Sequence, residues 1–330
     1  MNILIVKLGA IGDVVMASSM LEASRSIDKN ASITWLCGKG VEPLVRSFVG
    51  VDRVITIDEN RLVSGGSWER IIELIETWRQ LFLKRFDLVV IGHTDYRYYL
   101  LTVFVLAKNK RCLRGRRLVR GRWHASEYAR LIYDVDGPDI PTVKLSRINA
   151  ETDNGTINSL PKGQRVLMFP GGARNMLRDD ALRRWPIEYY RILAEKIIQR
   201  GVSVVIAGGN DDIWIRDSFK NVDVIDMIGM CSLPQVIALC AACELVVTHD
   251  SGPLHLSIAA GTDTLALFGP TNPMEKVPSD SKVKVLWGGE QLRCRPCYDG
   301  RSYSICSSNL CLKDLTVEKV YQEVTRILHK

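Results

Sequence analysis

The chain has 330 residues, of which 46% are hydrophobic and 25% are charged. It is too long for one typical domain and accommodates two, each with its own core, in an ordinary soluble globular protein. The formal net charge of +7 and the isoelectric point near 8.9 favour anionic partners: a nucleotide, a phosphorylated glycolipid, an acidic membrane surface or nucleic acid.

No targeting segment or membrane-spanning helix is expected. Lys7 and Asp13 interrupt the apolar amino terminus, which is typical of a strand rather than a signal peptide. The most apolar run, residues 98–107, is too short to cross a bilayer and is either a core helix or a peripheral membrane contact. We therefore expect a cytoplasmic protein, and association with the cytoplasmic face of the inner membrane stays open.

The first residues predict the opening of a Rossmann-like unit. A buried strand at residues 1–7 is followed by a glycine turn and a helix over residues 14–26. The turn has the spacing Gly9-x-x-Gly12, which differs from the dinucleotide fingerprint and so argues against NAD. Asp13 stands at the amino end of the helix, where the helix dipole favours a carboxylate. It is either a general base at a cleft or only a helix cap.

The rest of the first half alternates between strands and helices. His93, Thr94 and Asp95 follow the last strand and fall at the carboxyl edge of the sheet. The basic segment, residues 108–122, contains no acidic residue and either faces phosphates or is a solvated loop. The expected strands are residues 32–36, 53–57 and 87–92, the helices are residues 40–48, 68–83 and 123–133, and a linker over residues 134–164 carries an extended piece at 142–145.

The second half restarts the same alternation. A glycine turn containing Gly171 and Gly172 follows its first strand. We expect two successive doubly wound α/β domains, residues 1–155 and 156–330, with a cleft between them. The expected strands are residues 165–169, 202–207, 222–226, 245–247 and 264–268, and the helices are residues 187–200, 213–220, 233–242 and 254–260.

Polar residues gather between the strand at residues 245–247 and the helix that follows it. They lie at the carboxyl end of a strand and in the first turn of a helix, which is where open α/β sheets bind ligands. The helix start offers N–H groups and a partial positive charge to an anion such as a diphosphate. The alternative is that Asp250 or Ser251 only caps the helix. The polar residues are His249, Asp250, Ser251, Gly252 and His255.

Several motifs, in order and at characteristic spacing over residues 1 to about 280, resemble glycosyltransferase family nine. These are the ADP-heptose:lipopolysaccharide heptosyltransferases, and the resemblance implies a GT-B fold with two Rossmann-like domains facing each other across a cleft. The motifs are KLGAIGDVV at 7–15, WHASEY at 123–128, FPGGA at 169–173, RRWP at 183–186, THDSGPLHLSIAAG at 248–261 and LFGPTNP at 267–273.

The resemblance implies an inverting transfer of a heptose from ADP-heptose to a hydroxyl of a lipopolysaccharide-core or related glycan. Asp13 matches the family's general base, and the diphosphate motif matches Asp250, Ser251, Gly252 and His255. No cofactor is implied for the chemistry, and nucleic acid is not an implied partner. The glycines of the two turns, Gly12, Gly171 and Gly172, are implied to lie against substrate.

Two arginines are candidates for the phosphates. Arg183 stands where many members of the family have lysine, so the positive charge is kept but its geometry changes. Arg174 follows the glycine turn and is implied to neutralise the leaving diphosphate; for either arginine the alternative is a solvated side chain. Asn210 or Asp211 lies near the position where the family places a carboxylate on the nucleoside ribose.

Four of the nine cysteines cluster in residues 294–311 of the second domain. Their count and closeness are typical of a structural zinc or iron site, and disulfides or free thiols are the alternatives. Family members that modify autotransporters carry an iron-binding cysteine finger. The last helix, residues 317–328, is expected to pack back towards the first domain. The four candidate metal ligands are Cys294, Cys297, Cys306 and Cys311.

Two other functions stay open. The first is a transferase of the same fold that modifies an autotransporter-type protein or uses another sugar nucleotide. The second, more remote, is a Rossmann oxidoreductase or a nucleotide-binding protein without catalysis. The missing dinucleotide fingerprint argues against the second.

Overall fold

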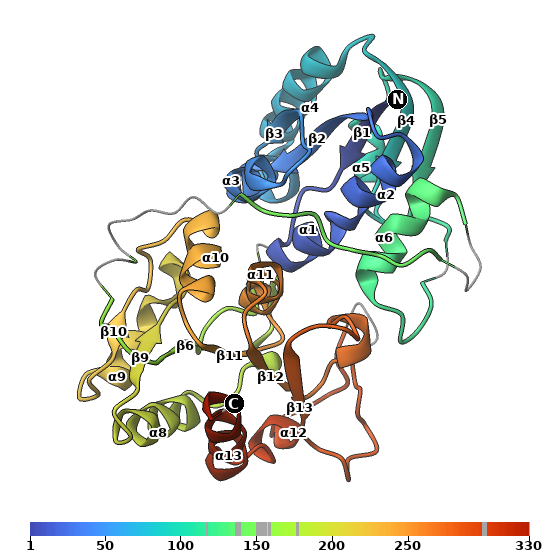
Figure 1. Ribbon diagram of the computed structural model, residues 1–330. Coiled ribbons are helices and arrows are strands. Elements are labelled where there is room, and N and C mark those ends of the chain that lie inside the picture. Colours follow the sequence, from blue (N-terminus) through green and yellow to red (C-terminus); the bar gives the residue numbers. More distant parts are fainter. Residues whose placement is uncertain are drawn as a thin grey trace. The chain divides into compact units, whose positions relative to one another are not determined.

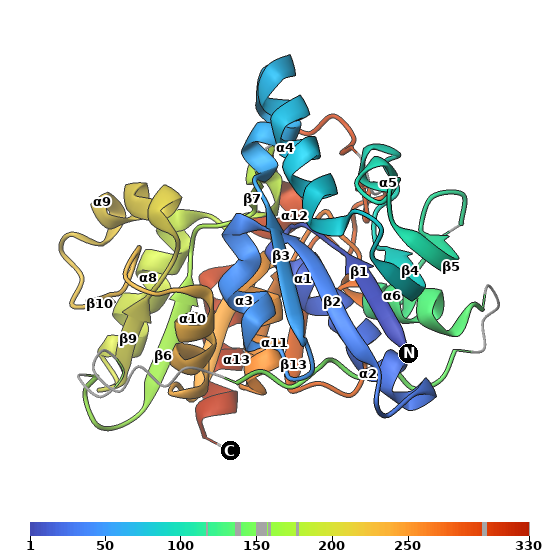
Figure 2. The same cartoon turned by 90° about the horizontal axis from the view of Figure 1, so that it is seen from above.

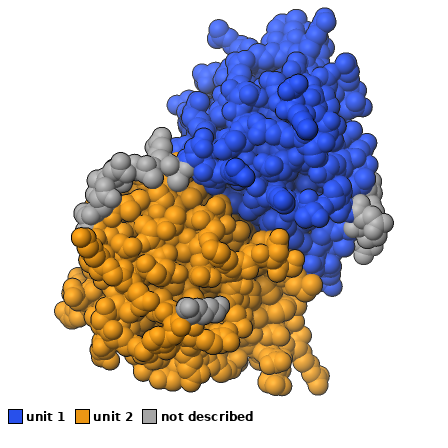
Figure 3. Space-filling model, in the orientation of Figure 1, with its two compact units in different colours: residues 1–149 blue, residues 150–330 orange. Residues whose placement is uncertain are grey.

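The computed structural model describes residues 1–116, 118–135, 140–149, 157, 160–175, 178–298 and 302–329. The chain divides into two compact units, residues 1–149 and 150–330 (Figures 1 and 3). Each unit contains a parallel sheet with helices packed on it. The expected boundary between residues 155 and 156 lies outside the described residues, close to this division.

Unit 1 has a five-stranded parallel sheet in the order β3-β2-β1-β4-β5. The chain winds outward from β1 to β3 on one side and through β4 to β5 on the other (Figure 2). The point where the winding reverses therefore lies between β1 and β4, and ligands bind at the carboxyl ends of strands at such a point. The strands are β1 (Asn2–Val6), β2 (Ser32–Gly38), β3 (Arg53–Ile57), β4 (Arg85–Ile91) and β5 (Leu106–Cys112).

The helices of unit 1 follow the expected order with several local changes. The helix expected over residues 14–26 is two helices that meet at Ser18. A π-helical turn precedes the fourth helix. The helices are α1 (Ile11–Ala17), α2 (Ser19–Ile27), η1 (Lys39–Val41), α3 (Glu42–Ser47), η2 (Asn60–Ser64), α4 (Ser67–Leu81), α5 (Arg97–Leu100) and α6 (His124–Tyr133).

The apolar run at residues 98–107 is not a core helix, so that interpretation is wrong. Helix α5 ends at Leu100, and the chain continues through a turn into β5. Leu101 and Val105 enter the core of unit 1, whereas Val103 and Phe104 are exposed. A turn of this kind buries only part of its side chains, which is why the apolar composition did not produce a buried helix.

Unit 2 has a six-stranded parallel sheet in the order β10-β9-β6-β11-β12-β13. Its winding reverses between β6 and β11. A small antiparallel hairpin, β7 (Arg174–Asn175) with β8 (Arg178–Asp179), stands where a loop was expected. The sheet strands are β6 (Arg165–Phe169), β9 (Ser203–Ile206), β10 (Ile225–Asp226), β11 (Leu245–His249), β12 (Thr264–Phe268) and β13 (Val283–Trp287).

The core of unit 2 includes the last helix of the chain. Val320 and Val324 of that helix are buried together with Tyr190 and Leu193 of α8. Among the described helices of the chain, none combines the length and apolar character needed to cross a membrane. The helices of unit 2 are η3 (Ala181–Arg183), α8 (Ile187–Ile198), η4 (Asn210–Ile215), α9 (Arg216–Phe219), α10 (Leu233–Ala241), α11 (Gly252–Ala260), η5 (Pro273–Glu275), α12 (Leu310–Lys313) and α13 (Val317–Leu328).

Candidate active site

In unit 2 the predicted diphosphate motif lies at the point where the sheet reverses. Strand β11 ends at His249, helix α11 begins at Gly252, and the buried residues Asp250 and Ser251 connect them. Ser251 is the N-cap residue, but its side chain does not cap the helix, because its hydroxyl donates to the carbonyl of His249 at 3.2 Å. The capping interpretation is therefore wrong for Ser251, and the N-cap side chain does not satisfy the first-turn amides that attract anions.

Asp250 does not cap the helix either, because its carboxylate pairs with Arg183. Nη1 of Arg183 lies 3.3 Å from Oδ2 of Asp250, and its Nη2 donates to Oδ2 of Asp180 at 2.5 Å. Burial acts to raise the pKa of Asp250, but the positive charges of Arg183 and Lys276 outweigh it and hold that pKa below its usual value. The structure thus places Arg183 at the motif, with its charge shared between two carboxylates.

The glycine turn after β6 lies against the start of α11. Gly172 has a φ of +80°, and a Cβ atom there would lie 3.5 Å from Cβ of Ser251. A Cβ on Gly171 would lie 2.3 Å from Oδ1 of Asp212, so any larger residue would displace this carboxylate. Nε of Arg184 donates to the carbonyl of Gly172 at 2.8 Å and holds the turn. The turn and the diphosphate motif therefore form one continuous edge.

Asp212 also contributes to this edge. The sequence had indicated its neighbours Asn210 and Asp211 instead. Its Oδ1 accepts from the amide of Gly172 and its Oδ2 from the amide of Gly209, both at 2.9 Å. Asn210 and Asp211 are exposed. The sequence could have indicated this role of Asp212, because Asp212 lies three residues after Gly209 at the start of a helical turn. A carboxylate at this spacing accepts a hydrogen bond from the N-cap amide.

The remaining predicted residues of unit 2 differ in how far they enter the site. His255 is buried, and its charge is one of those that lower the pKa of Asp250. Arg174 lies in the hairpin, where its Nη2 pairs with Asp179 at 2.8 Å and its side chain is exposed. His249 is fully buried, its Nδ1 lies 3.2 Å from the hydroxyl of Tyr190, and burial lowers its pKa to about 3. His249 is therefore neutral at physiological pH.

In unit 1 the predicted base lies where β1 ends. Asp13 is in the first turn of α1, but the N-cap position belongs to Ala10, so Asp13 is not the cap. Its Oδ2 lies 3.3 Å from Nζ of Lys7, and 38% of its side chain is exposed whereas Lys7 is 3% exposed. Gly12 is buried beside it in the same turn. The arrangement is an accessible carboxylate backed by a buried cation.

Further polar residues surround this pair. Tyr128 of α6 is buried, its ring centroid lies 5.4 Å from Nζ of Lys7, and burial together with Asp13 raises its pKa well above the usual value. The amide of Leu8 donates to Nε2 of His93 at 3.0 Å, which connects the carboxyl ends of β1 and β4. Burial raises the pKa of Glu59, whose Oε1 would lie 3.2 Å from a Cβ on Gly9. Of these, His93 had been noted at the sheet edge, whereas Lys7, Glu59 and Tyr128 had not been identified as site residues.

The predicted zinc or iron site is not supported. Cys294 and Cys306 are exposed, Cys297 is half-buried and Cys311 is buried, and all are free thiols. A Cβ on Gly269 would lie 2.8 Å from Sγ of Cys311, so this thiol packs closely against interior backbone while two others are at the surface. Within the described ranges, no three His, Cys, Asp or Glu side chains are arranged to hold a metal ion.

The two parallel sheets, with glycine turns at strand ends and a helix start beside one of them, define a doubly wound α/β protein of the kind that binds nucleotides. A family model described as glycosyltransferase family 9 (heptosyltransferase) matches residues 116–304. The chain therefore belongs to this family and is a glycosyltransferase, as predicted.

Individual proteins and solved structures are also similar to the chain. The chain is similar to lipopolysaccharide heptosyltransferase 2 of Escherichia coli strain K12, with 24% identity over 359 aligned positions that cover 99% of each chain. Its structure resembles that of a family 9 glycosyl transferase from Veillonella parvula, with a TM-score of 0.79 and 21% identity over 100% of this chain and 97% of that one. It also resembles the E. coli heptosyltransferase WaaC with ADP, with a TM-score of 0.73 and 17% identity over 99% of this chain and 100% of that one. The predicted GT-B fold class is confirmed.

Proposed function

We propose that this protein transfers a heptose from ADP-heptose to a hydroxyl of a lipopolysaccharide-core glycan, with Asp13 as the general base. The observation that carries the proposal is the pairing of accessible Asp13 with buried Lys7 at the carboxyl end of β1. The names of the similar proteins, a lipopolysaccharide heptosyltransferase and a heptosyltransferase with ADP, support the choice of donor and acceptor.

The donor diphosphate binds at the start of α11. Backbone amides of the first turn and the partial positive charge of the helix attract it, and the glycine turn at Gly171 and Gly172 lets backbone approach its oxygens. Arg183 contributes positive charge while it holds Asp250 in place. His255 completes the motif from the first turn of the helix.

The reaction is one inverting displacement. The carboxylate of Asp13 accepts the proton of the acceptor hydroxyl as the hydroxyl oxygen bonds to the anomeric carbon of the heptose. The bond from that carbon to the diphosphate oxygen breaks, and its electron pair leaves with ADP. The ammonium of Lys7 stabilises the negative charge of Asp13 before the proton moves and keeps the carboxylate in place.

The acceptor is a glycolipid at the cytoplasmic face of the inner membrane. The net charge of +7 suits a phosphorylated acceptor of this kind. A metal-bound cysteine cluster would have supported transfer to an autotransporter-type protein, and the described residues form no such cluster.

Calorimetric binding of ADP, GDP, UDP and NAD to the purified protein tests the donor site. We expect ADP to bind and the other nucleotides to bind at least tenfold more weakly. Asp250→Ala and His255→Ala should each weaken ADP binding by roughly tenfold, a loss of about 1.4 kcal/mol. Asp223→Ala is the control, because Asp223 is an exposed aspartate of unit 2 outside the motif and the glycine turn. Preference for UDP, GDP or NAD would exclude ADP-heptose as donor, and unchanged ADP affinity in the two variants would move the diphosphate elsewhere.

A further inference from the structure

Two successive carboxylates follow β3, and their surroundings differ. Oδ1 of Asp58 accepts from the amides of Asn60 at 3.1 Å and Arg61 at 3.2 Å. Oδ2 of Asp58 lies 3.3 Å from Nζ of Lys39. Glu59 is half-buried, and its carboxylate accepts no hydrogen bond from any residue that the structure describes. Asp58 therefore holds the turn, whereas the carboxylate of Glu59 is available to a ligand.

Helix α4 supports this turn with its polar face. Oε1 of Glu73 accepts from the amide of Asp58 at 2.7 Å, and the side chains of Glu73 and Thr77 are buried. Ile71 and Ile75 lie on the other face of the helix and are exposed. The hydrogen bond from Asp58 to Glu73 fixes the backbone next to Glu59, so the position of the free carboxylate is set by the fold.

The carboxylate of Glu59 lies over two glycines at the carboxyl edge of the sheet. A Cβ on Gly38, the last residue of β2, would lie 2.3 Å from Oε2 of Glu59. A Cβ on Gly9 would lie 3.2 Å from Oε1. Gly9 belongs to the turn that leads from β1 to Asp13. The two glycines thus leave room for this carboxylate beside the turn that carries the proposed base.

Lys7 acts on both carboxylates of this edge. Its Nζ lies 3.3 Å from Oδ2 of Asp13. Burial raises the pKa of Glu59, and the positive charge of Lys7 acts in the opposite direction. Tyr98 is also near, because burial and then the negative charge of Glu59 raise its pKa. A half-buried carboxylate without a donor is stabilised when a ligand hydroxyl donates to it, and this one belongs to the polar group around Asp13.

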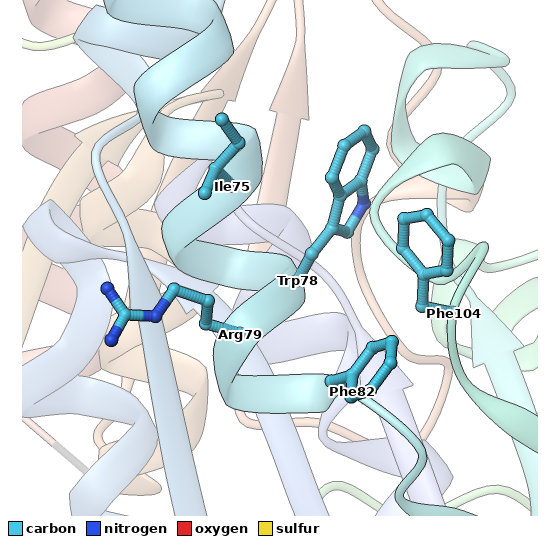
Figure 4. A pocket seen from close by; sticks show the side chains of 5 residues that line it. All are labelled: Ile75, Trp78, Arg79, Phe82 and Phe104. Carbon is cyan, nitrogen blue, oxygen red and sulfur yellow. The ribbon is translucent and has the colours of Figure 1, made fainter.

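A pocket beside α4 offers less to a sugar (Figure 4). Nε1 of Trp78 already donates to the carbonyl of Leu100 at 2.9 Å. The other lining side chains are apolar except for one guanidinium, and none is a carboxylate or an amide. Sugar hydroxyls need such groups to fix their orientation, so Glu59 is the better candidate. The pocket is lined by Ile75, Trp78, Arg79, Phe82 and Phe104.

We propose that Glu59 determines acceptor specificity, because its carboxylate accepts a hydrogen bond from a second hydroxyl of the sugar whose first hydroxyl reacts at Asp13. The inference rests on the proposed function, since Asp13 defines the reacting hydroxyl. It narrows the acceptor to a sugar residue with a free hydroxyl besides the reacting one. Holding both hydroxyls orients the sugar ring, so that the reacting oxygen is placed for the displacement. A hydrogen bond to a carboxylate is among the stronger ones available for this purpose.

Calorimetric binding of a lipopolysaccharide-core oligosaccharide, with ADP present, tests this role. The oligosaccharide is compared with its monodeoxy analogues, each of which lacks one hydroxyl. Glu59→Met removes the carboxylate and keeps an unbranched side chain, and should weaken binding of the parent oligosaccharide by about tenfold. One analogue should bind the wild type about tenfold more weakly than the parent does, yet bind Glu59→Met as well as the parent does, because the hydrogen bond is already missing.

Glu59→Gln keeps an oxygen acceptor without the charge, so it should lose only part of this discrimination and carries the same comparison if Glu59→Met does not fold. Glu22→Met is the matched control. Glu22 is also half-buried, but it lies on α2, which leads to the opposite edge of the sheet where β2 begins. Its binding of every oligosaccharide should equal that of the wild type, and ADP affinity should be unchanged in all variants.

Three results would overturn the role of Glu59. These are failure of the wild type to bind the oligosaccharide, unchanged binding by Glu59→Met, and a loss by the same factor for the parent and every analogue, which a merely structural role would produce. Heptose transfer is assayed separately. A wild type that shows Glu59-dependent binding without transfer would refute the proposed chemistry alone, and transfer without this dependence would refute the role of Glu59 alone.

Discussion

The ammonium of Lys7 lies 3.3 Å from the carboxylate of Asp13, and the lysine is almost fully buried while the aspartate is partly exposed. A buried cation beside an accessible carboxylate stabilises its ionised form at the end of β1. Lys7 also lies over the ring of Tyr128, so its position is held from two sides. The chemistry proposed for Asp13 depends on this pair.

Lys7→Met should reduce transfer by roughly 10- to 100-fold in kcat, with little change in ADP affinity, because it removes the charge that positions Asp13. Steady-state kinetics and calorimetry measure the two effects. Lys39→Met is the control, because Lys39 makes an exposed pair with Asp58 at the same 3.3 Å distance. Equal kinetics of the two variants would show that Lys7 only fills space.

Asp212→Ala should destabilise unit 2 by about 2–3 kcal/mol, because two amides, those of Gly172 and Gly209, lose their acceptor. ADP affinity should fall as well, since the glycine turn loses its support. Thermal unfolding and calorimetry measure the two effects. Asp211→Ala, one residue earlier and exposed, should change the free energy of unfolding by less than about 0.5 kcal/mol. A stability of Asp212→Ala equal to that of Asp211→Ala would contradict the assignment.

His249 should make stability fall in weak acid. Burial lowers its pKa in the folded protein to about 3, below the usual value of 6.5, so the unfolded chain binds more protons between these values. The folded state therefore loses stability as pH falls from about 6.5 towards 3. Between pH 7 and pH 5 the loss from this one group is about 2 kcal/mol.

His249→Asn removes this titration while keeping a polar group near the hydroxyl of Tyr190. Denaturant unfolding at pH 7 and pH 5 should therefore show a smaller loss for the variant than for the wild type. His93 is also buried with a lowered pKa, and its contribution is common to both proteins. An identical loss in the two proteins would contradict a neutral, buried His249.

The sequence predicted the sheet strands whose residues are apolar on both faces, such as β1 and β11. It did not predict β5 (Leu106–Cys112), because its sequence LAKNKRC is polar and basic and β5 is an edge strand. It did not predict the orientation of α4 either. Periodicity shows that Ile71, Ile75, Trp78 and Phe82 share a helix face, but it does not show whether the sheet or the solvent lies beside that face.

The sequence predicted the parts of the candidate site that depend on the backbone. Glycine turns at strand ends and a helix start at Gly252 follow from local rules, and these positions lie where they were expected. Asp212 was not named, because the sequence does not show which carboxylate of the loop turns back to the backbone; the ribose contact of Asn210 or Asp211 stays a prediction. The cysteine spacing likewise shows closeness along the chain, whereas metal binding requires four thiols that point to one centre.

The role of Asp13 as general base is tested most directly by comparing Asp13→Asn with the wild type. The assay measures transfer of heptose from ADP-heptose to a lipopolysaccharide-core acceptor. Asparagine keeps the shape of the side chain and removes its basicity. We expect kcat to fall by about 10²- to 10⁴-fold, the range typical of a lost general base, while ADP affinity by calorimetry stays within a few-fold. Turnover of Asp13→Asn at the wild-type rate would contradict the assignment of Asp13 as the base.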